Sequence, residues 1–264
     1  MVPPGGTHAG DATARFTELV QRADHSIPLD EAMLCIAAHD HAVDERAVLA
    51  ELDALSEHAP DDPDALAHEL FVAQGFRGDT VDYGDPRNSF LDDVLARRVG
   101  IPITLSIVMI EVGRRRGIDL GGVGMPGHFL VGGAPGVYYD PFHGGARLDV
   151  DGARRLFATV GGDMPFRQDY LARVGPRAIC ARVLANLVNT YVDRDPPSAI
   201  WATRLRLRIP GLSAAERRSA ATLLGSLGQF EEAAHELESL VSLVDDDGAR
   251  RLARDAVALR ARAN

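Results

Sequence analysis

Three residues close together in the sequence, His128, Asp140 and His143, have the side chains best suited to chemistry. A histidine that is hydrogen-bonded to a carboxylate can act as a general base. Two histidines and one carboxylate can instead hold iron or zinc. Both members of the His128–Asp140 pair also have a structural interpretation: a core histidine satisfied by a carboxylate or a backbone carbonyl, and an aspartate that caps the turn at the end of a strand.

Two hydroxyls and one amide lie upstream of this group. Either Thr104 or Ser106 could serve as a nucleophile with His128 as its base, and Thr104 is the closer in register. The alternative for both hydroxyls is helix capping or a hydrogen bond back to the chain. Asn88 could help to hold an oxyanion, or it could cap a helix after a turn that contains proline.

The two cysteines, Cys35 and Cys180, both lie in apolar segments with helical spacing. Free cysteine is among the most frequently buried residue types, so we predict that both pack in the core and that neither is a nucleophile. Two cysteines exclude a disulfide framework and a zinc site built from several thiolates. This usage fits the reducing cytoplasm.

The elements that must position these residues follow from the apolar pattern. Residues 14–74 and 103–116 have helical spacing, and Gly117 follows the second helix where a C-terminal glycine is favoured. Short strands are then predicted at residues 118–123, 128–131, 137–140 and 146–150, in an antiparallel sheet because the connections are too short for parallel crossovers. His128 and Asp140 would lie on two strands of one hairpin-like unit.

From Pro176 onward the pattern is helical again. A capping box is expected at Ser213–Glu216, and the stretch Leu223–Ala233 resembles the hinge of a tetratricopeptide repeat. Two helix pairs fit between Pro176 and Val244. Because so few repeats rarely form a free-standing solenoid, we predict that they pack on the preceding core.

Composition limits the possible partners of this 264-residue chain. The formal net charge of -10 argues against a protein that coats nucleic acid or an anionic membrane surface. No apolar run reaches the roughly 18 residues of a membrane helix. The Pro/Gly-rich residues 1–10 indicate a disordered tail rather than a signal peptide. The run Arg114–Arg116 is predicted to form a solvated helix face.

Blocks of sequence in one order and spacing support a family resemblance over roughly Leu29 to Val244. The blocks are Gly75–Asp79, Asp85–Leu91, Arg98–Ser106, Met125–Leu130 and Asp140–Gly145. Together they resemble the SirB family, a branch of the transglutaminase-like superfamily with a helical N-terminal region and tetratricopeptide-like helices at the C-terminus.

The resemblance implies a papain-like site, in which a cysteine at the start of a buried helix faces a histidine and an aspartate on antiparallel strands. His128 and Asp140 match the histidine and aspartate positions. The helix start corresponds to residues 102–104, which are Pro-Ile-Thr, so the nucleophilic cysteine is missing. The family has asparagine where this chain has His143, and we therefore predict no metal and no cofactor.

We predict an α+β fold that is mainly helical, with a transglutaminase-like (papain-like) core, a small antiparallel sheet and C-terminal helical repeats. Residues 1–10 would form the tail, 11–175 the helical region with the core, and 176–264 the tetratricopeptide-like helices. The favoured function is a non-catalytic, regulatory module that binds a protein or peptide in the cytoplasm; a related domain in an F-box protein supports this by analogy of fold.

The alternative function is a hydrolase or acyl transferase that uses Thr104 or Ser106 with His128 and Asp140. The two functions differ in whether a hydroxyl lies within hydrogen-bond reach of His128.

Overall fold

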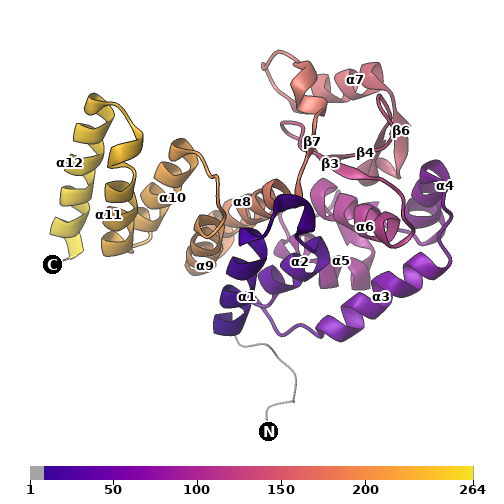
Figure 1. The fold of residues 1–264 in the computed structure, drawn as a ribbon, viewed down its shortest axis with the longest axis horizontal. Helices are drawn as coiled ribbons and strands as arrows, with labels where there is room; N and C mark the ends of the chain where they lie inside the picture. The colour runs from indigo at the N-terminus through magenta and orange to yellow at the C-terminus, as the bar shows by residue number, and fades with distance from the viewer. Residues whose placement is uncertain (1–8, 264) are drawn as a thin grey trace, which may run out of the picture. The chain divides into compact units, whose positions relative to one another are not determined.

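The computed structural model describes residues 9–263 (Figure 1). Residues 1–8 of the predicted tail lie outside the described residues. The first helix begins at Ala9, so the last two residues assigned to the tail belong to that helix. Contacts divide the chain into two compact units, one ending at Asn186 and the other beginning at Leu187. This division falls inside a helix, eleven residues beyond the end of the core at residue 175 that the sequence suggested.

Helices dominate the first half of the first unit, as predicted. They are α1 (Ala9–Gln21), α2 (Leu29–Ala37), α3 (Glu45–Glu57), α4 (Pro63–His68), the π-helical turn η2 (Glu69–Ala73) and α5 (Leu91–Arg97). Asp44 and Asp62 cap α3 and α4, because each carboxylate accepts a hydrogen bond from a backbone N–H in the first turn. Pro63 occupies the first turn of α4, where its missing N–H costs nothing.

Helix α6 (Pro102–Arg115) is the central helix of this unit, and every residue from Pro102 to Gly113 is buried. It contacts α3, α5 and the strands β3 (Gly121–Val123) and β4 (Leu130–Gly132). Gly117 follows the helix with a φ of 73°, a left-handed conformation that glycine adopts without strain. The prediction for this helix is confirmed.

The five-stranded sheet has the strand order β6-β5-β4-β3-β7, and every pairing is antiparallel. Besides β3 and β4 it contains β5 (Tyr138–Asp140), β6 (Ala146–Leu148) and β7 (Arg173–Val174). The four predicted strands are therefore confirmed, and β7 was missed. A separate two-stranded parallel pair joins β1 (Arg77–Gly78) to β2 (Val99–Gly100) just before α6.

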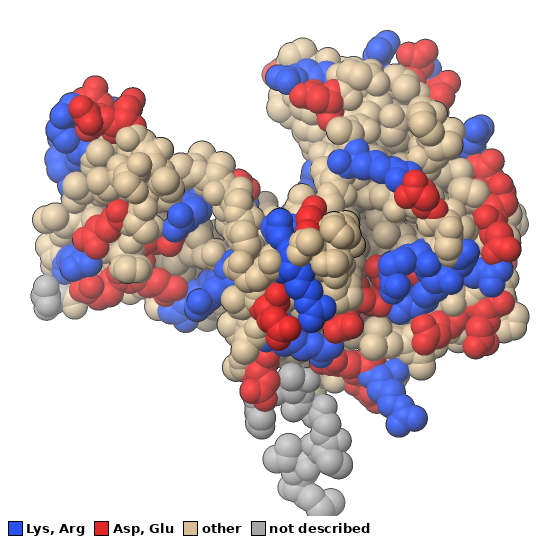
Figure 2. All heavy atoms as spheres, in the orientation of Figure 1, with Lys and Arg blue, Asp and Glu red and all other residues tan. Residues whose placement is uncertain are grey.

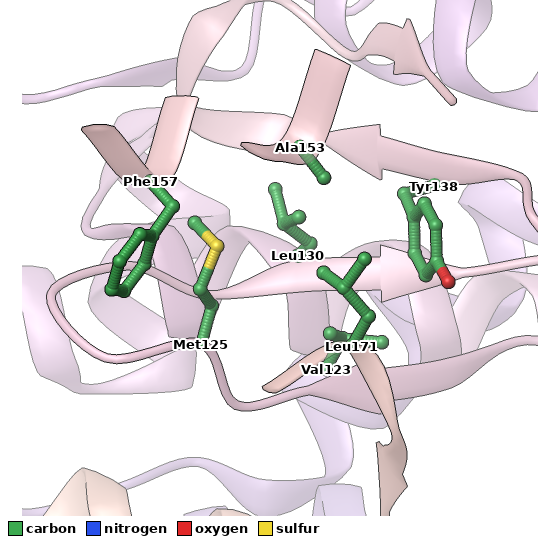
Figure 3. Close-up of a cluster of buried hydrophobic side chains, with 7 residues drawn as sticks. All are labelled: Val123, Met125, Leu130, Tyr138, Ala153, Phe157 and Leu171. Atoms are coloured by element: carbon green, nitrogen blue, oxygen red, sulfur yellow. The ribbon is translucent and has the colours of Figure 1, made fainter. Parts of the chain in front are cut away.

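Helix α7 (Val150–Val160), which the sequence analysis did not predict, covers one face of the sheet (Figure 1). Figure 3 shows the side chains of the resulting apolar cluster, which converge between the strands and α7. The cluster consists of Val123, Met125, Leu130, Tyr138, Ala153, Phe157 and Leu171. Helix α6 also contacts β3 and β4. These two strands are therefore held both by α6 and by the apolar cluster.

The second unit is helical. Its elements are the last turns of α8 (Pro176–Arg194), then α9 (Pro196–Leu207), α10 (Ala214–Ser226), α11 (Phe230–Ser239) and α12 (Asp246–Ala263). The capping box at Ser213 and Glu216 is confirmed. Helices α10 and α12 approach closely at Gly225, where a Cβ atom would lie 2.8 Å from Leu259. A side chain at this position would force the end of the Leu259 side chain to move.

The predicted solvated face at Arg114–Arg116 is wrong for one of its three members. The Arg115 side chain is only 12% exposed and pairs with Asp30, Asp53 and Glu111. Basic and acidic side chains are interspersed on the face shown in Figure 2, with uncharged surface between them. Among the described residues, no helix is both long and apolar enough to span a membrane.

Candidate functional site

His128 and Asp140 come together where the neighbouring strands β4 and β5 meet at one end. His128 precedes β4 and Asp140 ends β5, and these antiparallel strands pair Val131 with Tyr139. The His128 Nε2 atom lies 2.9 Å from Asp140 Oδ1. Both side chains are almost completely buried, with 4% and 3% exposed, so the pair is enclosed by protein.

A tight turn and a distant arginine hold His128 in place. Gly127 has a φ of 77°, and a Cβ atom there would lie 2.5 Å from the carbonyl oxygen of Val160. Arg182 Nη2 donates hydrogen bonds to the backbone oxygens of Met125, at 2.8 Å, and His128, at 2.9 Å. Burial lowers the pKa of Arg182. Sequence reasoning missed this anchor, because Arg182 follows His128 by 54 residues and lies in an apolar helix.

Asp140 binds a second histidine. Its Oδ2 atom lies 2.7 Å from His143 Nδ1, and the His143 ring stacks on His128 with centroids 5.6 Å apart. Burial opposes ionisation of Asp140, but the hydrogen bonds from His128 and His143 outweigh it and hold the pKa of this carboxyl below its usual value. Phe142 meets His128 edge-on at 6.1 Å.

Thr104 and Ser106 direct their hydroxyls to the backbone rather than to His128. Thr104 Oγ1 donates to the carbonyl oxygen of Asn88, at 2.6 Å, and also lies 3.1 Å from the oxygen of Ile101 and 3.2 Å from its nitrogen. Ser106 Oγ donates to the oxygen of Pro102 at 2.7 Å. Both side chains are buried, so these hydroxyls serve the start of α6.

We expect Thr104→Val to lower the free energy of unfolding by about 1–3 kcal/mol, because the buried partners of the hydroxyl lose their hydrogen bonds while the shape is kept. Thr104→Ser retains the hydroxyl and is the matched control, with a smaller loss. Urea denaturation followed by circular dichroism measures both. Equal stability of the valine variant and the natural protein would contradict the structural role.

Asn88 anchors a loop and has no donor left for an oxyanion. Its Nδ2 group donates both hydrogens, to Asp79 Oδ2 at 3.0 Å and to the backbone oxygen of Asp82 at 2.9 Å. Its Oδ1 atom accepts from Arg97 at 3.1 Å. The helix-capping alternative is also wrong, because Asp85 caps this 3-10 turn, η3 (Pro86–Ser89).

Both cysteines are buried, and neither lies at the start of α6. Burial raises the pKa of Cys35 to about 11 and that of Cys180 to about 12. We therefore expect iodoacetamide at neutral pH to label neither thiol quickly in the folded protein, and to label both after unfolding in urea. Mass spectrometry of timed samples checks this, and rapid labelling of either thiol in the folded state would reopen cysteine chemistry.

Two groups of side chains could hold a metal ion among the described residues. The first is His128, Asp140 and His143, and the second is His41 with two neighbouring aspartates, Asp92 and Asp93. In each group the ligand atoms all lie within 4.8 Å of one another. The first group coincides with the site that the sequence singled out.

Comparison with curated proteins finds relatives that match much of this chain. A UPF0162 protein of Xylella fastidiosa (strain Temecula1) is 38% identical over 189 residues, which is 68% of this chain and 66% of the relative. A UPF0162 protein of Pseudomonas aeruginosa is 29% identical over 83% of this chain and 85% of its own length. F-box only protein 21 of Mus musculus is 36% identical over 98 residues, 33% of this chain and 16% of that protein.

No solved structure matches the chain. The family model described as the transglutaminase-like superfamily matches residues 14–185, which include the central helix α6, the sheet and the His128–Asp140 pair. That match covers more than half of the sequence. The chain therefore belongs to the transglutaminase-like superfamily.

Proposed function

We propose that this chain is a SirB-type member of the superfamily that binds a protein or peptide and does not catalyse acyl transfer. The observation that carries the proposal is the start of α6, where the fold would present a nucleophile. Pro102, Ile103 and Thr104 occupy it, and the Thr104 hydroxyl is held by the backbone. A general base without a nucleophile cannot form a covalent intermediate.

The alternative function, a hydrolase or acyl transferase based on Thr104 or Ser106, has less support. Nucleophilic attack requires a hydroxyl that is hydrogen-bonded to His128 and can reach a substrate. Both hydroxyls are buried and directed to carbonyl oxygens instead. His128 is hydrogen-bonded to Asp140.

A fixed loop beside the His128–Asp140 pair is the surface that we propose binds the partner. Residues 79–84 present Val81, which is 97% exposed, and Tyr83, which is 56% exposed. The Tyr83 ring meets Phe142 edge-on at 5.9 Å, and Phe142 in turn contacts His128. Tyrosine is among the residue types that most often anchor protein interfaces, and Val81 adds exposed apolar surface beside it.

The loop is held in shape by its own hydrogen bonds. Asp79 Oδ1 accepts from the backbone N–H groups of Val81 and Asp82, both at 2.9 Å, while Asn88 binds the other oxygen of the same carboxylate. An ordered loop loses less conformational entropy on binding than a flexible one. Asn88 thus supports binding by positioning Val81 and Tyr83.

One relative gives further support for a binding role by analogy. A segment similar to this chain occurs in F-box only protein 21, a much longer protein in which it makes up 16% of the length. We also propose that the helices after Pro176 are tetratricopeptide-like and that the chain acts in the cytoplasm, since both of its cysteines are unpaired. The net charge of -10 favours a partner other than nucleic acid.

The test compares two charged substitutions on exposed valines. Val81→Asp alters the proposed surface, whereas Val257→Asp alters an exposed position on α12, where the side chain is 67% exposed. The full chain and both variants are immobilised and incubated with lysate of the native cell, and bound proteins are quantified by mass spectrometry. We expect a partner that is retained by the natural chain and the Val257 variant and is lost from the Val81 variant.

Two results would contradict the proposal. One is a partner that is lost only from the Val257 variant, which would place binding on the C-terminal helices. The other is hydrolase or acyl-transfer activity of the purified chain that disappears in His128→Ala and in Thr104→Val, which would establish the alternative function. Circular dichroism of each variant checks that it is folded.

A further inference from the structure

We propose that His128, Asp140 and His143 form a binding site for one divalent transition-metal ion, open to solvent on the side of His143. The inference is independent of the partner-binding proposal. It reverses the prediction made from the sequence. That prediction was of no metal, because the SirB family has asparagine where this chain has His143. The structure instead supplies three donor groups in one place.

One ligand atom from each residue lies within 4.8 Å of the other two, close enough for a single ion, and the two histidines contact different oxygens of the carboxylate. His128 Nε2 lies 2.9 Å from Asp140 Oδ1, and His143 Nδ1 lies 2.7 Å from Asp140 Oδ2. Ligand atoms that each lie about 2.1 Å from the same ion are separated by roughly 3 Å. His128 lies just before β4, Asp140 ends β5, and His143 ends the 3-10 turn η4 (Pro141–His143) that follows β5. The paired strands β4 and β5 thus hold the donors near one another.

The geometry of the two rings also suits a metal. Asp140 supplies a carboxylate, and an imidazole can offer a lone pair on the nitrogen that faces the carboxylate while its other nitrogen carries the proton. For His128 that nitrogen is Nδ1, and for His143 it is Nε2. The two histidines share a single carboxylate, so the ion would replace two hydrogen bonds with coordination bonds.

The second group of potential ligands, around His41, serves as the control, because both of its ring nitrogens already contact a carboxylate. His41 contacts a different carboxylate through each ring nitrogen, Asp92 at 2.6 Å and Asp40 at 3.2 Å. The hydrogen bonds that His41 makes to Asp40 and Asp92 raise its pKa to about 10, so a metal ion would have to displace a strongly held proton.

Access to the first site comes from one side. The His143 side chain is 55% exposed, while His128 and Asp140 are buried. An ion could therefore enter past His143 and keep water in its remaining coordination positions. Two nitrogen donors and one carboxylate favour Zn²⁺, Co²⁺ or Fe²⁺ over Mg²⁺ and Ca²⁺, which prefer oxygen ligands.

The experiment uses the full chain, without an added histidine tag, after treatment with a chelator. Zn²⁺ and Mg²⁺ are titrated by calorimetry, and Co²⁺ by its visible absorption. We expect one Zn²⁺ per chain and no saturable Mg²⁺ binding. His143→Asn and His143→Ala change an exposed position, and both should weaken Zn²⁺ binding at least about tenfold. His41→Asn should bind as the natural chain does.

A second readout on the unaltered sequence removes any question of folding. Diethylpyrocarbonate modifies accessible histidines, and Zn²⁺ should protect the peptide that contains His143 but not the peptide that contains His41. The proposal is overturned if the natural chain shows no saturable Zn²⁺ binding, if both His143 variants bind Zn²⁺ as tightly as the natural chain, or if His41→Asn abolishes binding.

Discussion

Replacing Arg115 with methionine is expected to lower the free energy of unfolding by about 3–5 kcal/mol, the cost of leaving buried charges without their partner. Arg115 lies 2.7 Å from Asp30 and 2.8 Å from Glu111, and the side chains of these acids are only 5% and 2% exposed. Burial raises the pKa of Glu111, and the nearby Asp30 raises it further. Removing Arg115 would leave two buried carboxylates with Arg114 as their shared basic partner.

The adjacent arginine provides the control for this experiment. Arg116 pairs with Asp61, whose side chain is 74% exposed, and exposed ion pairs contribute little to stability. Arg116→Met should therefore cost less than about 1 kcal/mol. Urea denaturation of both variants measures the difference. A loss below about 1 kcal/mol in Arg115→Met would show that the buried charges are hydrated or neutralised in another way.

Gly127→Ala is expected to cost about 2–5 kcal/mol, because two penalties act at one residue. The left-handed backbone costs an alanine about 1–2 kcal/mol. The new Cβ atom would also lie 2.5 Å from the backbone oxygen of Val160, a contact that only a backbone shift can relieve, at about 1–3 kcal/mol. The affected turn carries His128, so its hydrogen bond to Asp140 should weaken too.

Gly136→Ala isolates the first penalty. Gly136 has a φ of 79°, close to the 77° of Gly127, but a Cβ atom there meets nothing within 4 Å. Thermal and urea unfolding of the two variants should differ by the cost of the contact with Val160. If both variants lose the same stability, the close approach at Gly127 does not constrain the turn.

Local patterns were sufficient to predict the elements that carry the candidate site. The apolar spacing and Gly117 defined α6, and the glycine-punctuated stretches after it became β3 to β6. Strand β7 was missed because it has only two residues, Arg173 and Val174, and pairs with β3 about 50 residues earlier. A strand of two residues is too short to show the alternation of apolar and polar residues by which strands are recognised.

The roles of individual side chains were harder to predict, because they depend on partners that only the folded chain brings into contact. Asn88 has the composition of an oxyanion donor, but its amide is used by Asp79 and Asp82. Arg115 belongs to a basic run that is typical of a solvated surface, yet acids on α2 and α6 hold it in the interior. Asp30 lies 85 residues before Arg115, and the hydrogen bonds of Asn88 form only when its loop folds back on it, so a local pattern shows neither.

Because Arg182 holds the turn at Met125 and His128, the order of synthesis affects when this turn can form. The ribosome adds about 5–20 residues per second, so the arginine is synthesised about 3–11 s after the histidine that it anchors. During that interval the nascent chain holds both His128 and Asp140 but lacks their anchor. We expect the turn to become fully ordered only when α8 emerges, which leaves it accessible to chaperones during that interval.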